Sequence, residues 1–422
     1  MQIKTQNYVL FRTQCTLKFE IMPFWFRKIA IALLLLFVCQ NLLAQAGSGN
    51  YDEDAAWATG GNIITAVPFL LISPDARASG MGDAGVASSP DINSQHWNAA
   101  KFAFIEDDFG ISLTYTPWLR MLVRDMNLLY LAGYYRLDNN WVLGASMRYF
   151  SLGEVTFRRD RDDPPDVRRP NEYAFDVSLS RRLTEHFSLA VTGRYIRSDL
   201  GSGFQDHTTG VRTRAANSGA VDVSMFYTRD IIRGSEPSSF ALGLNISNIG
   251  AKISYSEAML RDFLPANLRL GGAYTRQIDQ FNEITVMLDF NKLLVPTPLA
   301  RGDTTSRDPR ELGVMEGIFN SLHVAPGGFR EKMQEIKISF GIEYTYNQVF
   351  SVRAGYFHEH RNKGGRQFFT VGAGLRFNVF EVDFAYLLPR TNNMAAAVNP
   401  LRNTMRFSLR FNFAEHMRRQ NT

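Results

Sequence analysis

The chain has 422 residues, a formal net charge of +5, and an aromatic content of 13%. Its mean hydropathy is slightly negative, which excludes a bundle of membrane-spanning helices. Both cysteines lie within the first 39 residues, so the rest of the chain has no disulfide to stabilise it.

Residues 1–46 have the pattern of a leader. Arg27 and Lys28 precede a short apolar run, residues 29–38, which is about half of the ~20 residues that a membrane-spanning helix needs. Ala44-Gln45-Ala46 follows with the spacing of a cleavage site, so we predict a secretory signal peptide cut after Ala44 or Ala46. Because Met22 stands just before this pattern, residues 22–46 are the expected signal peptide and residues 1–21 an upstream extension of the start.

The positive charge belongs mainly to this leader. Residues 1–44 hold five basic residues and one acidic residue, which leaves 41 basic and 40 acidic residues and a net charge of +1. A nearly neutral mature chain gives no reason to expect a nucleic-acid partner.

Residues 47–108 begin with a polar stretch and continue as a segment rich in Gly, Ala, Ser, Asp and Pro. They show no sustained alternation of apolar and polar residues. We therefore interpret residues 47–108 as an N-terminal plug, or hatch, that precedes the strands.

From Phe109 onward, short segments alternate apolar and polar residues, as strands with one apolar and one polar face do. In the last segment Met405, Phe407, Leu409, Phe411 and Phe413 oppose Arg406, Ser408, Arg410 and Asn412. The pattern predicts fourteen strands, to within about two, that start near Gly110, Met126, Asn140, Tyr173, Phe187, Ala220, Ser238, Asn267, Asn282, Glu335, Phe350, Phe368, Phe380 and Thr404.

The connections between these segments differ systematically in length. Those that follow even-numbered strands are short: residues 137–140, 184–186, 230–237, 277–281, 347–348 and 378–379. Those that follow odd-numbered strands are mostly long: residues 153–172, 198–219, 247–266 and 292–334. A soluble β-sandwich also alternates, but it has no reason to sort its loops, whereas outer-membrane barrels have short periplasmic turns and long outer loops.

We therefore predict an all-β fold, a 14-stranded antiparallel transmembrane β-barrel over residues 109–414 with an N-terminal plug. Residues 415–422 would be a periplasmic tail, and both termini would lie in the periplasm of a cell with an outer membrane. Ten charged residues on the polar faces are expected to face the lumen, because charge on the lipid face costs ~2–4 kcal/mol for Arg or Lys at the membrane midplane: Arg148, Asp176, Arg194, Asp222, Asp289, Glu343, Arg376, Asp383, Arg406 and Arg410.

Several short motifs have plainer explanations than chemistry. Residues 80–85 fit the G-x-G-x-x-G spacing, but Pro residues flank them where a nucleotide site needs a strand and a helix, so tight packing is favoured. His358 and His360 could ligate a metal, yet no third ligand is near in sequence and a solvated loop is favoured. No serine-hydrolase or zinc-protease motif is present, so we expect neither catalysis nor a cofactor.

Two outer loops have distinct compositions. Residues 158–169 form a mixed-charge run, which is usually solvated surface. In the loop 292–334, apolar residues recur at helical spacing after Pro309, so an amphipathic helix is expected there. Its apolar side would rest on the barrel rim, on membrane or on a partner.

The plug sequence resembles a known family. Residues 62–85, NIITAVPFLLISPDARASGMGDAG, and residues 94–101, SQHWNAAK, are similar to the N-terminal signature of PorV, an outer-membrane component of the type IX secretion system. The resemblance continues along the mature chain, more loosely in the outer loops. PorV is in turn similar in fold to the FadL class of fourteen-stranded barrels with an N-terminal hatch.

The resemblance implies a cargo shuttle. Such proteins take exported cargo by its C-terminal signal domain from the large translocon barrel and deliver it to the sortase of the surface attachment complex. The expected partners are therefore outer-membrane lipid, the translocon, the sortase and the signal domains of cargo. Contacts with cargo or partners are expected in the outer loops, at Arg158, Arg159, Arg161, Arg168, Arg169, Phe204, Leu312, Met315, Ile318, Phe319 and Leu322.

The plug residues that match the signature are assigned to packing inside the barrel: Pro74, Asp75, Arg77, Gly80, Gly82, Asp83, Gly85, Trp97 and Asn98. Three alternatives stay open from the sequence. They are a FadL-like transporter of hydrophobic small molecules, an outer-membrane enzyme that acts on lipid, and a passive scaffold within the same secretion complex.

Overall fold

The computed structural model describes residues 61–120, 123, 125–157, 166–203, 212–233, 236–256, 261–300, 307–390 and 404–413. The predicted leader and tail lie outside the described residues, as do the three arginines of the mixed-charge run at 158, 159 and 161 and the phenylalanine at 204. All described residues belong to one compact unit, residues 54–422.

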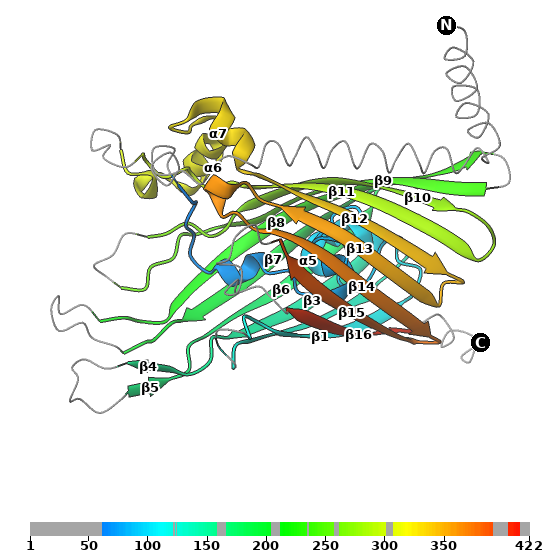
Figure 1. The fold of residues 1–422 in the computed structure, drawn as a ribbon, viewed down its shortest axis with the longest axis horizontal. Coiled ribbons are helices and arrows are strands. Elements are labelled where there is room, and N and C mark those ends of the chain that lie inside the picture. Colours follow the sequence, from blue (N-terminus) through cyan, green and yellow to red (C-terminus); the bar gives the residue numbers. More distant parts are fainter. Residues whose placement is uncertain are drawn as a thin grey trace, which may run out of the picture. The chain divides into compact units, whose positions relative to one another are not determined.

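Fourteen strands close into an antiparallel barrel, in which each strand pairs with its neighbour in sequence and the last strand pairs with the first (Figure 1). The strands are β1 Phe109–Pro117, β2 Asn127–Arg136, β3 Trp141–Ser151, β6 Asn171–Arg182, β7 Phe187–Asp199, β8 Ala216–Arg233, β9 Glu236–Gly250, β10 Asn267–Gln277, β11 Asn282–Leu293, β12 Ile336–Tyr346, β13 Phe350–His358, β14 Gln367–Phe377, β15 Phe380–Pro389 and β16 Met405–Phe413. Closure by β1 and β16, in register from Phe109↔Phe413 to Tyr115↔Phe407, leaves the barrel without an unpaired edge along that seam.

The fourteen predicted strands are confirmed, each starting within a few residues of its expected position. Two details differ. The turn after β8 is shorter than predicted, because β8 and β9 pair as far as Arg233 and Glu236. The loop after β3, for which no strand was predicted, contains a two-stranded ribbon, β4 Val155–Phe157 and β5 Asp166–Arg168.

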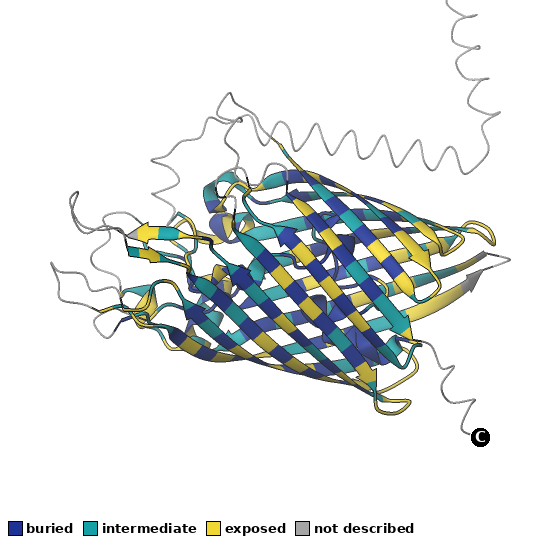
Figure 2. Ribbon diagram, turned by 90° about the horizontal axis from the view of Figure 1, so that it is seen from below, coloured by how far each residue is buried: buried dark blue, intermediate teal, exposed yellow. Residues whose placement is uncertain are grey.

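Exposed and buried residues alternate along the wall (Figure 2). In β16, Met405 and Phe407 point outward and are exposed, whereas Arg406, Ser408 and Arg410 point inward and are buried. This is the arrangement that a strand needs when its apolar side faces lipid and its polar side faces the inside of a barrel.

Nine of the ten charged residues predicted to face the lumen are buried. Arg376 is the exception: its side chain is 49% exposed at the end of β14, where it pairs with Glu381 at 3.0 Å. Its direction along the strand is as predicted, but the residue lies one position before the end of β14, where its side chain reaches solvent.

Short helical segments precede and interrupt the strands. They are η1 Pro68–Leu71, α4 Ala76–Ser79, α5 Ser94–Trp97 and η2 Ala99–Phe104 before the barrel, and η3 Pro309–Glu311, α6 Val314–His323, α7 Gly328–Gln334 and η4 Arg361–Lys363 in the loops. None of the described helices is long and apolar enough to cross a membrane.

Candidate functional site: the hatch and the long-loop rim

Residues 61–108, which we call the hatch, pack inside the ring of strands (Figure 1). The helix α4 contacts β14, β15 and β16, and η2 contacts β3, β6, β7 and β8 on the other side of the barrel. Most hatch residues from Ala66 to Ala103 are buried. The hatch therefore occupies space that a barrel of this strand number would otherwise leave open.

The first turn of α4 is fixed by a buried carboxylate. Asp75, which follows the buried Pro74, caps the helix by accepting a hydrogen bond from the Ala78 amide at 2.9 Å. Its second oxygen accepts a hydrogen bond from the indole N–H of Trp97 at 2.6 Å, so Asp75 joins α4 to α5. Burial, together with the nearby Asp91, raises the pKa of Asp75 above its usual range.

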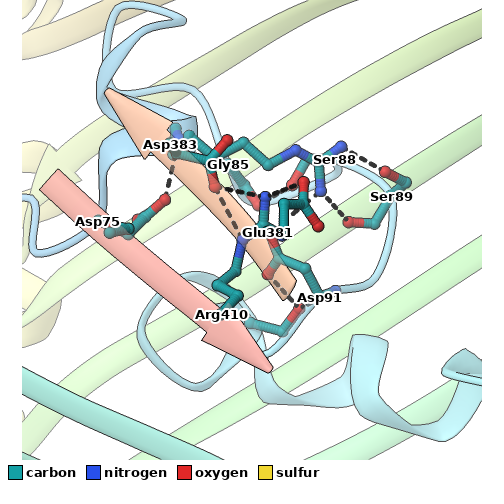
Figure 3. A network of polar contacts seen from close by, with 12 residues as sticks. Asp75, Gly85, Ser88, Ser89, Asp91, Glu381, Asp383 and Arg410 are labelled. Carbon is teal, nitrogen blue, oxygen red and sulfur yellow. Dashed lines mark hydrogen bonds and ion pairs between the residues drawn. The ribbon is translucent and has the colours of Figure 1, made fainter. Parts of the chain in front are cut away.

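Ion pairs join the hatch to the wall (Figure 3). Arg77 of the hatch binds Glu343 of β12 at 2.7 Å and Asp91 of the hatch at 3.0 Å. Asp91 also lies 3.6 Å from Arg410 of β16. Although burial opposes its charge, the cations Arg77 and Lys101 lower the pKa of Asp91, so this carboxylate stays ionised.

The wall continues the network on its own side. Arg353 of β13 binds Glu343 at 2.5 Å and Asp383 at 2.6 Å, and Arg410 binds Asp383 at 2.6 Å and Glu381 at 2.5 Å. All of these side chains are less than a tenth exposed. Removal of one partner from such a buried pair typically costs about 3–5 kcal/mol, because the other charge is left buried and alone.

The glycines of the 80–85 motif allow close approach to the strands. Gly82 has φ +68°, and a side chain there would place its Cβ 2.7 Å from the backbone nitrogen of Tyr356 in β13. Gly80 lies against Gly372 of β14, and Gly85 lies against the Trp97 ring. The amide of Gly85 donates to Asp289 of β11 at 2.7 Å. This geometry shows why small residues stand at these positions in this chain.

Two further hatch residues bind the wall on the opposite side. Asn98 donates to the carbonyl of Met225 in β8 at 2.8 Å and to the carbonyl of Val86 at 3.0 Å. His96 lies between two wall arginines, Arg148 at 2.7 Å and Arg269 at 3.3 Å. Burial and these two cations lower the pKa of His96 well below its usual range, which keeps the imidazole neutral.

No feature of the sequence by itself assigned a role to His96. It is one residue before the predicted Trp97, and its contacts depend on arginines 52 and 173 residues away. Only the alternation of β3 and β10, which aims Arg148 and Arg269 inward, could have pointed to it.

A second buried cluster stabilises the wall at an irregularity between β8 and β9. The register shifts between Val221 and Val223, and Asn248 adopts φ +63° opposite this shift. Arg194 of β7 binds Asp176 at 2.6 Å and Asp222 at 3.0 Å, while the amide of Asn248 donates to Asp222 at 2.7 Å. One guanidinium therefore neutralises two buried carboxylates at the bulge.

We call the end of the barrel that has the long loops the long-loop rim. The structure brings only some of the predicted contact residues together there. Arg168 binds Asp166 within β5 at 2.7 Å and donates to the carbonyl of Ser202, and this second bond joins the β4–β5 ribbon to the next loop. Arg169 pairs with Glu154 and is largely exposed. No bond brings either arginine to the helices α6 and α7.

The predicted amphipathic helix is present as α6, but its orientation was not foreseen. The small residues Gly317 and Ser321 are buried, and Gly317 lies so close to the Phe263 ring that a Cβ would be 2.7 Å away. Met315, Phe319 and Leu322 point away from the barrel and are 56%, 59% and 48% exposed. Ile318 of α6 is half-buried, as is Leu312, which precedes the helix at the end of η3.

The neighbouring helix enlarges this apolar surface. Val324, Phe329 and Met333 are also exposed, and Phe329 is 80% exposed. We call these six side chains the α6–α7 patch: Met315, Phe319, Leu322, Val324, Phe329 and Met333. The part of the barrel rim that the structure describes does not cover the patch, so of the three predicted neighbours membrane and a partner remain.

Other motifs have no ligand-like geometry. Among the described residues, no group of three or more His, Cys, Asp or Glu side chains could hold a metal ion. The ring of His360 accepts the amide of Asn362, as a loop cap does.

The sequence matches the family described as Type IX secretion system protein PorV over residues 56–300, more than half of the chain. The chain belongs to the PorV family. It is thus an outer-membrane β-barrel of the type IX secretion system, and the resemblance noted in the hatch sequence is confirmed. No curated protein matches the chain.

Solved structures with a similar barrel include two toluene transporters and a FadL homologue. The toluene transporter TodX of P. putida is 11% identical, with a TM-score of 0.46 over 81% of this chain and 99% of TodX. The Ralstonia pickettii toluene transporter TbuX is 10% identical, with a TM-score of 0.41 over 80% of this chain and 98% of TbuX. A Pseudomonas aeruginosa FadL homologue is 12% identical, with a TM-score of 0.38 over 85% of this chain and all of the homologue.

Proposed function

We propose that this PorV-family protein is a non-enzymatic shuttle. It takes cargo that carries a C-terminal signal domain from the translocon and presents it to the sortase of the surface attachment complex. In this proposal both termini are periplasmic and the long-loop rim faces outward, because outer-membrane barrels have short periplasmic turns and long outer loops.

The observation that carries the proposal is the α6–α7 patch. Contiguous exposed apolar side chains on a polar loop mark a site for protein or membrane contact. The small residues of α6 hold the helix on the rim, and the two large residues Met315 and Phe319 are left free to contact a partner. Aromatic residues and methionine are the types enriched at the centres of protein interfaces.

The interior favours a carrier over a transporter of apolar molecules. The hatch is tied to β12, β16 and β11 by Arg77, Asp91 and Gly85, so an open path requires several buried bonds to break. The wall that surrounds the hatch has buried charges, Arg148, Arg194 and Asp222 among them. An apolar solute would have to pass these charged side chains, whereas a channel for apolar molecules needs an apolar lining.

The test is affinity purification of the tagged protein from detergent-solubilised outer membranes, with bound partners identified by mass spectrometry. We expect the wild type to retain cargo with uncleaved C-terminal signals, the translocon or the sortase. The double variant Met315→Ser, Phe319→Ser should retain at least about tenfold less cargo, because central apolar contacts are each worth about 2 kcal/mol or more. Phe377→Ser is the matched control, since Phe377 is 77% exposed at the opposite end of the barrel.

Recovery of the barrel alone, with a small apolar molecule inside, would overturn the shuttle in favour of a transporter. Equal retention of cargo by the patch variant and the control would move the cargo site away from α6 and α7.

A further inference from the structure

A cavity of about 400 Å³ opens at the long-loop rim, between the start of the hatch and the wall. Its volume lies within the range of ligand pockets. Apolar side chains form much of its lining, including Ile72, Trp118, Phe368 and Leu387. We call it the vestibule.

The charged groups of the vestibule are nearly all paired with each other. Glu359 binds Lys337 at 3.0 Å and Arg366 at 2.7 Å. Lys363 pairs with Glu331 and lies 3.7 Å from Glu335, whose carboxylate also binds Lys292 and Lys332. Because these charged side chains pair with one another, none of them is left without a counter-ion to bind a ligand.

Arg406, at the start of β16, is different. It is only 3% exposed, yet among the described residues no carboxylate lies within ion-pair distance of its guanidinium. Its Nε has no hydrogen-bond partner, and its guanidinium lies 5.9 Å from the centre of the Trp118 ring, while Asp83 of the hatch is the strongest opposite charge that acts on it from beyond ion-pair distance. A buried arginine without an anion is costly unless something else supplies one.

Asp83 of the hatch lines the same vestibule and is also unsatisfied. Its backbone has φ +60°, and although the residue is only half-buried, the Oδ1 atom of its carboxylate is buried and has no hydrogen-bond partner. The vestibule thus offers one unpaired planar cation and one unpaired acceptor, with apolar walls around both. Its complement is a group with one carboxylate, a neighbouring N–H donor and apolar side chains.

We propose that the vestibule binds the free C-terminal carboxylate of a polypeptide. Arg406 would hold the carboxylate through two parallel N–H···O bonds, the geometry for which a guanidinium is suited. Asp83 would accept a hydrogen bond from an amide N–H near the peptide's end. The apolar walls would receive its last side chains.

The charge of the site favours this ligand over others. Among the charged side chains described in the lining, Lys337 and Arg366 pair with Glu359 and Lys363 pairs with Glu331, so Arg406 is the cation that remains to bind a single carboxylate. A fatty acid supplies the carboxylate but leaves Asp83 without a donor.

The proposal deepens the proposed function and rests on it, because the cargo is held by its C-terminal signal domain. The vestibule opens at the same rim as the α6–α7 patch, so one cargo domain could contact both. The shuttle would then recognise the free end of the signal, and a chain whose end is blocked would bind less tightly.

The first experiment measures fluorescence anisotropy with the full-length protein in detergent micelles. The probes are a labelled pentapeptide that ends in two apolar residues, as the free acid and as the C-terminal amide. The free acid should bind at least about tenfold more tightly, as expected for a charge-assisted pair of hydrogen bonds. Arg406→Gln should reduce the affinity for the acid to that for the amide and leave the amide unchanged.

Arg366→Gln is the matched control, because it removes the same charge from the same vestibule at a residue that is already paired with Glu359. It should preserve the difference between acid and amide. Equal affinities for acid and amide in the wild type, or an equal effect of both variants, would overturn the proposal. If octanoate displaces the peptide at an equal or lower concentration, the ligand of the vestibule is an alkyl carboxylate and not a peptide.

A second experiment separates this proposal from the shuttle itself. A cargo signal domain with a natural C-terminus and one with an amidated C-terminus are each passed over the immobilised protein. Retention of the natural form and loss of the amidated form support both proposals. Equal retention of the two forms refutes the carboxylate site and leaves the shuttle standing, and retention of neither refutes the shuttle.

Discussion

Arg194→Met should be among the most damaging single substitutions in the wall. Arg194 is the cation that neutralises both Asp176 and Asp222, at 2.6 Å and 3.0 Å, and all three side chains are at most 4% exposed. Methionine fills a similar volume but leaves two buried carboxylates without a cation. The loss of one partner from a buried pair typically costs about 3–5 kcal/mol, so we expect a loss of free energy of unfolding in that range.

The assay is urea unfolding in detergent micelles, followed by the heat-modifiable mobility of the folded barrel on gels. Arg406→Met is the matched control, because Arg406 is equally buried but has no carboxylate partner, and it should change the free energy of unfolding by less than about 1 kcal/mol. The triple variant Arg194→Met, Asp176→Asn, Asp222→Asn should recover much of the loss. Equal destabilisation by both methionine variants would refute the reasoning, since it would attribute the cost to packing rather than to unpaired charge.

Three further outcomes follow from the hatch and the rim. Gly82→Val should loosen the hatch, because φ +68° and a Cβ 2.7 Å from Tyr356 are incompatible with a side chain. Faster hydrogen exchange across residues 76–91, with the barrel intact, would show this loosening, and unchanged exchange would contradict it. Burial opposes the charge of Glu359, but the cations Lys337 and Arg366 outweigh the effect of burial and lower the pKa of Glu359 to about 2. The stabilisation that the ionised Glu359 contributes is therefore full above the unfolded pKa near 4.5 and is lost as the pH falls towards 2. Protection factors across residues 359–366, which are exchange rates corrected for the intrinsic effect of pH, should therefore fall over that window in the wild type and stay nearly constant in Glu359→Gln. Trp97→Phe removes the indole N–H that Asp75 accepts, and it should lower the free energy of unfolding by about 1–3 kcal/mol in the micelle assay; no change would mean that this hydrogen bond does not hold α4 to α5.

The barrel was predictable from the sequence because each strand is defined by a pattern of residues that are close together in the sequence. Each strand must show one side to lipid and the other to the interior, so the alternation in segments such as Met405–Phe413 fixes both the face and the extent of the strand. Loop lengths then order the strands into up-and-down neighbours. The ribbon β4–β5 escaped prediction because a three-residue strand is too short for alternation to be visible.

The site was predictable only in outline. The helix α6 was found from its spacing, but the sequence could not tell that Gly317 and Ser321, rather than Met315 and Phe319, would face the barrel. That choice depends on the ring of Phe263, which occupies the space where a larger residue of α6 would have to fit.

The partners of the hatch were invisible for a related reason. The alternation predicted that Arg410 and Asp383 point inward, but not that Asp91, nearly 300 residues before them, would meet the same network. For Arg406, the sequence could not show the opposite case, the lack of an ion-pair partner within the described part of the chain. Arg406 has the same alternation as Arg410, four residues further along the strand, and only the three-dimensional arrangement shows that no carboxylate among the described residues pairs with it.

The shuttle is tested most directly by a photo-crosslinking amino acid placed in living cells at Phe319, in the α6–α7 patch, and separately at Phe377, at the opposite end of the barrel. The proposed function predicts crosslinks from position 319 to cargo that still carries its C-terminal signal, and none to such cargo from position 377. Crosslinks from position 319 to lipid alone, or cargo captured equally from both positions, would contradict it.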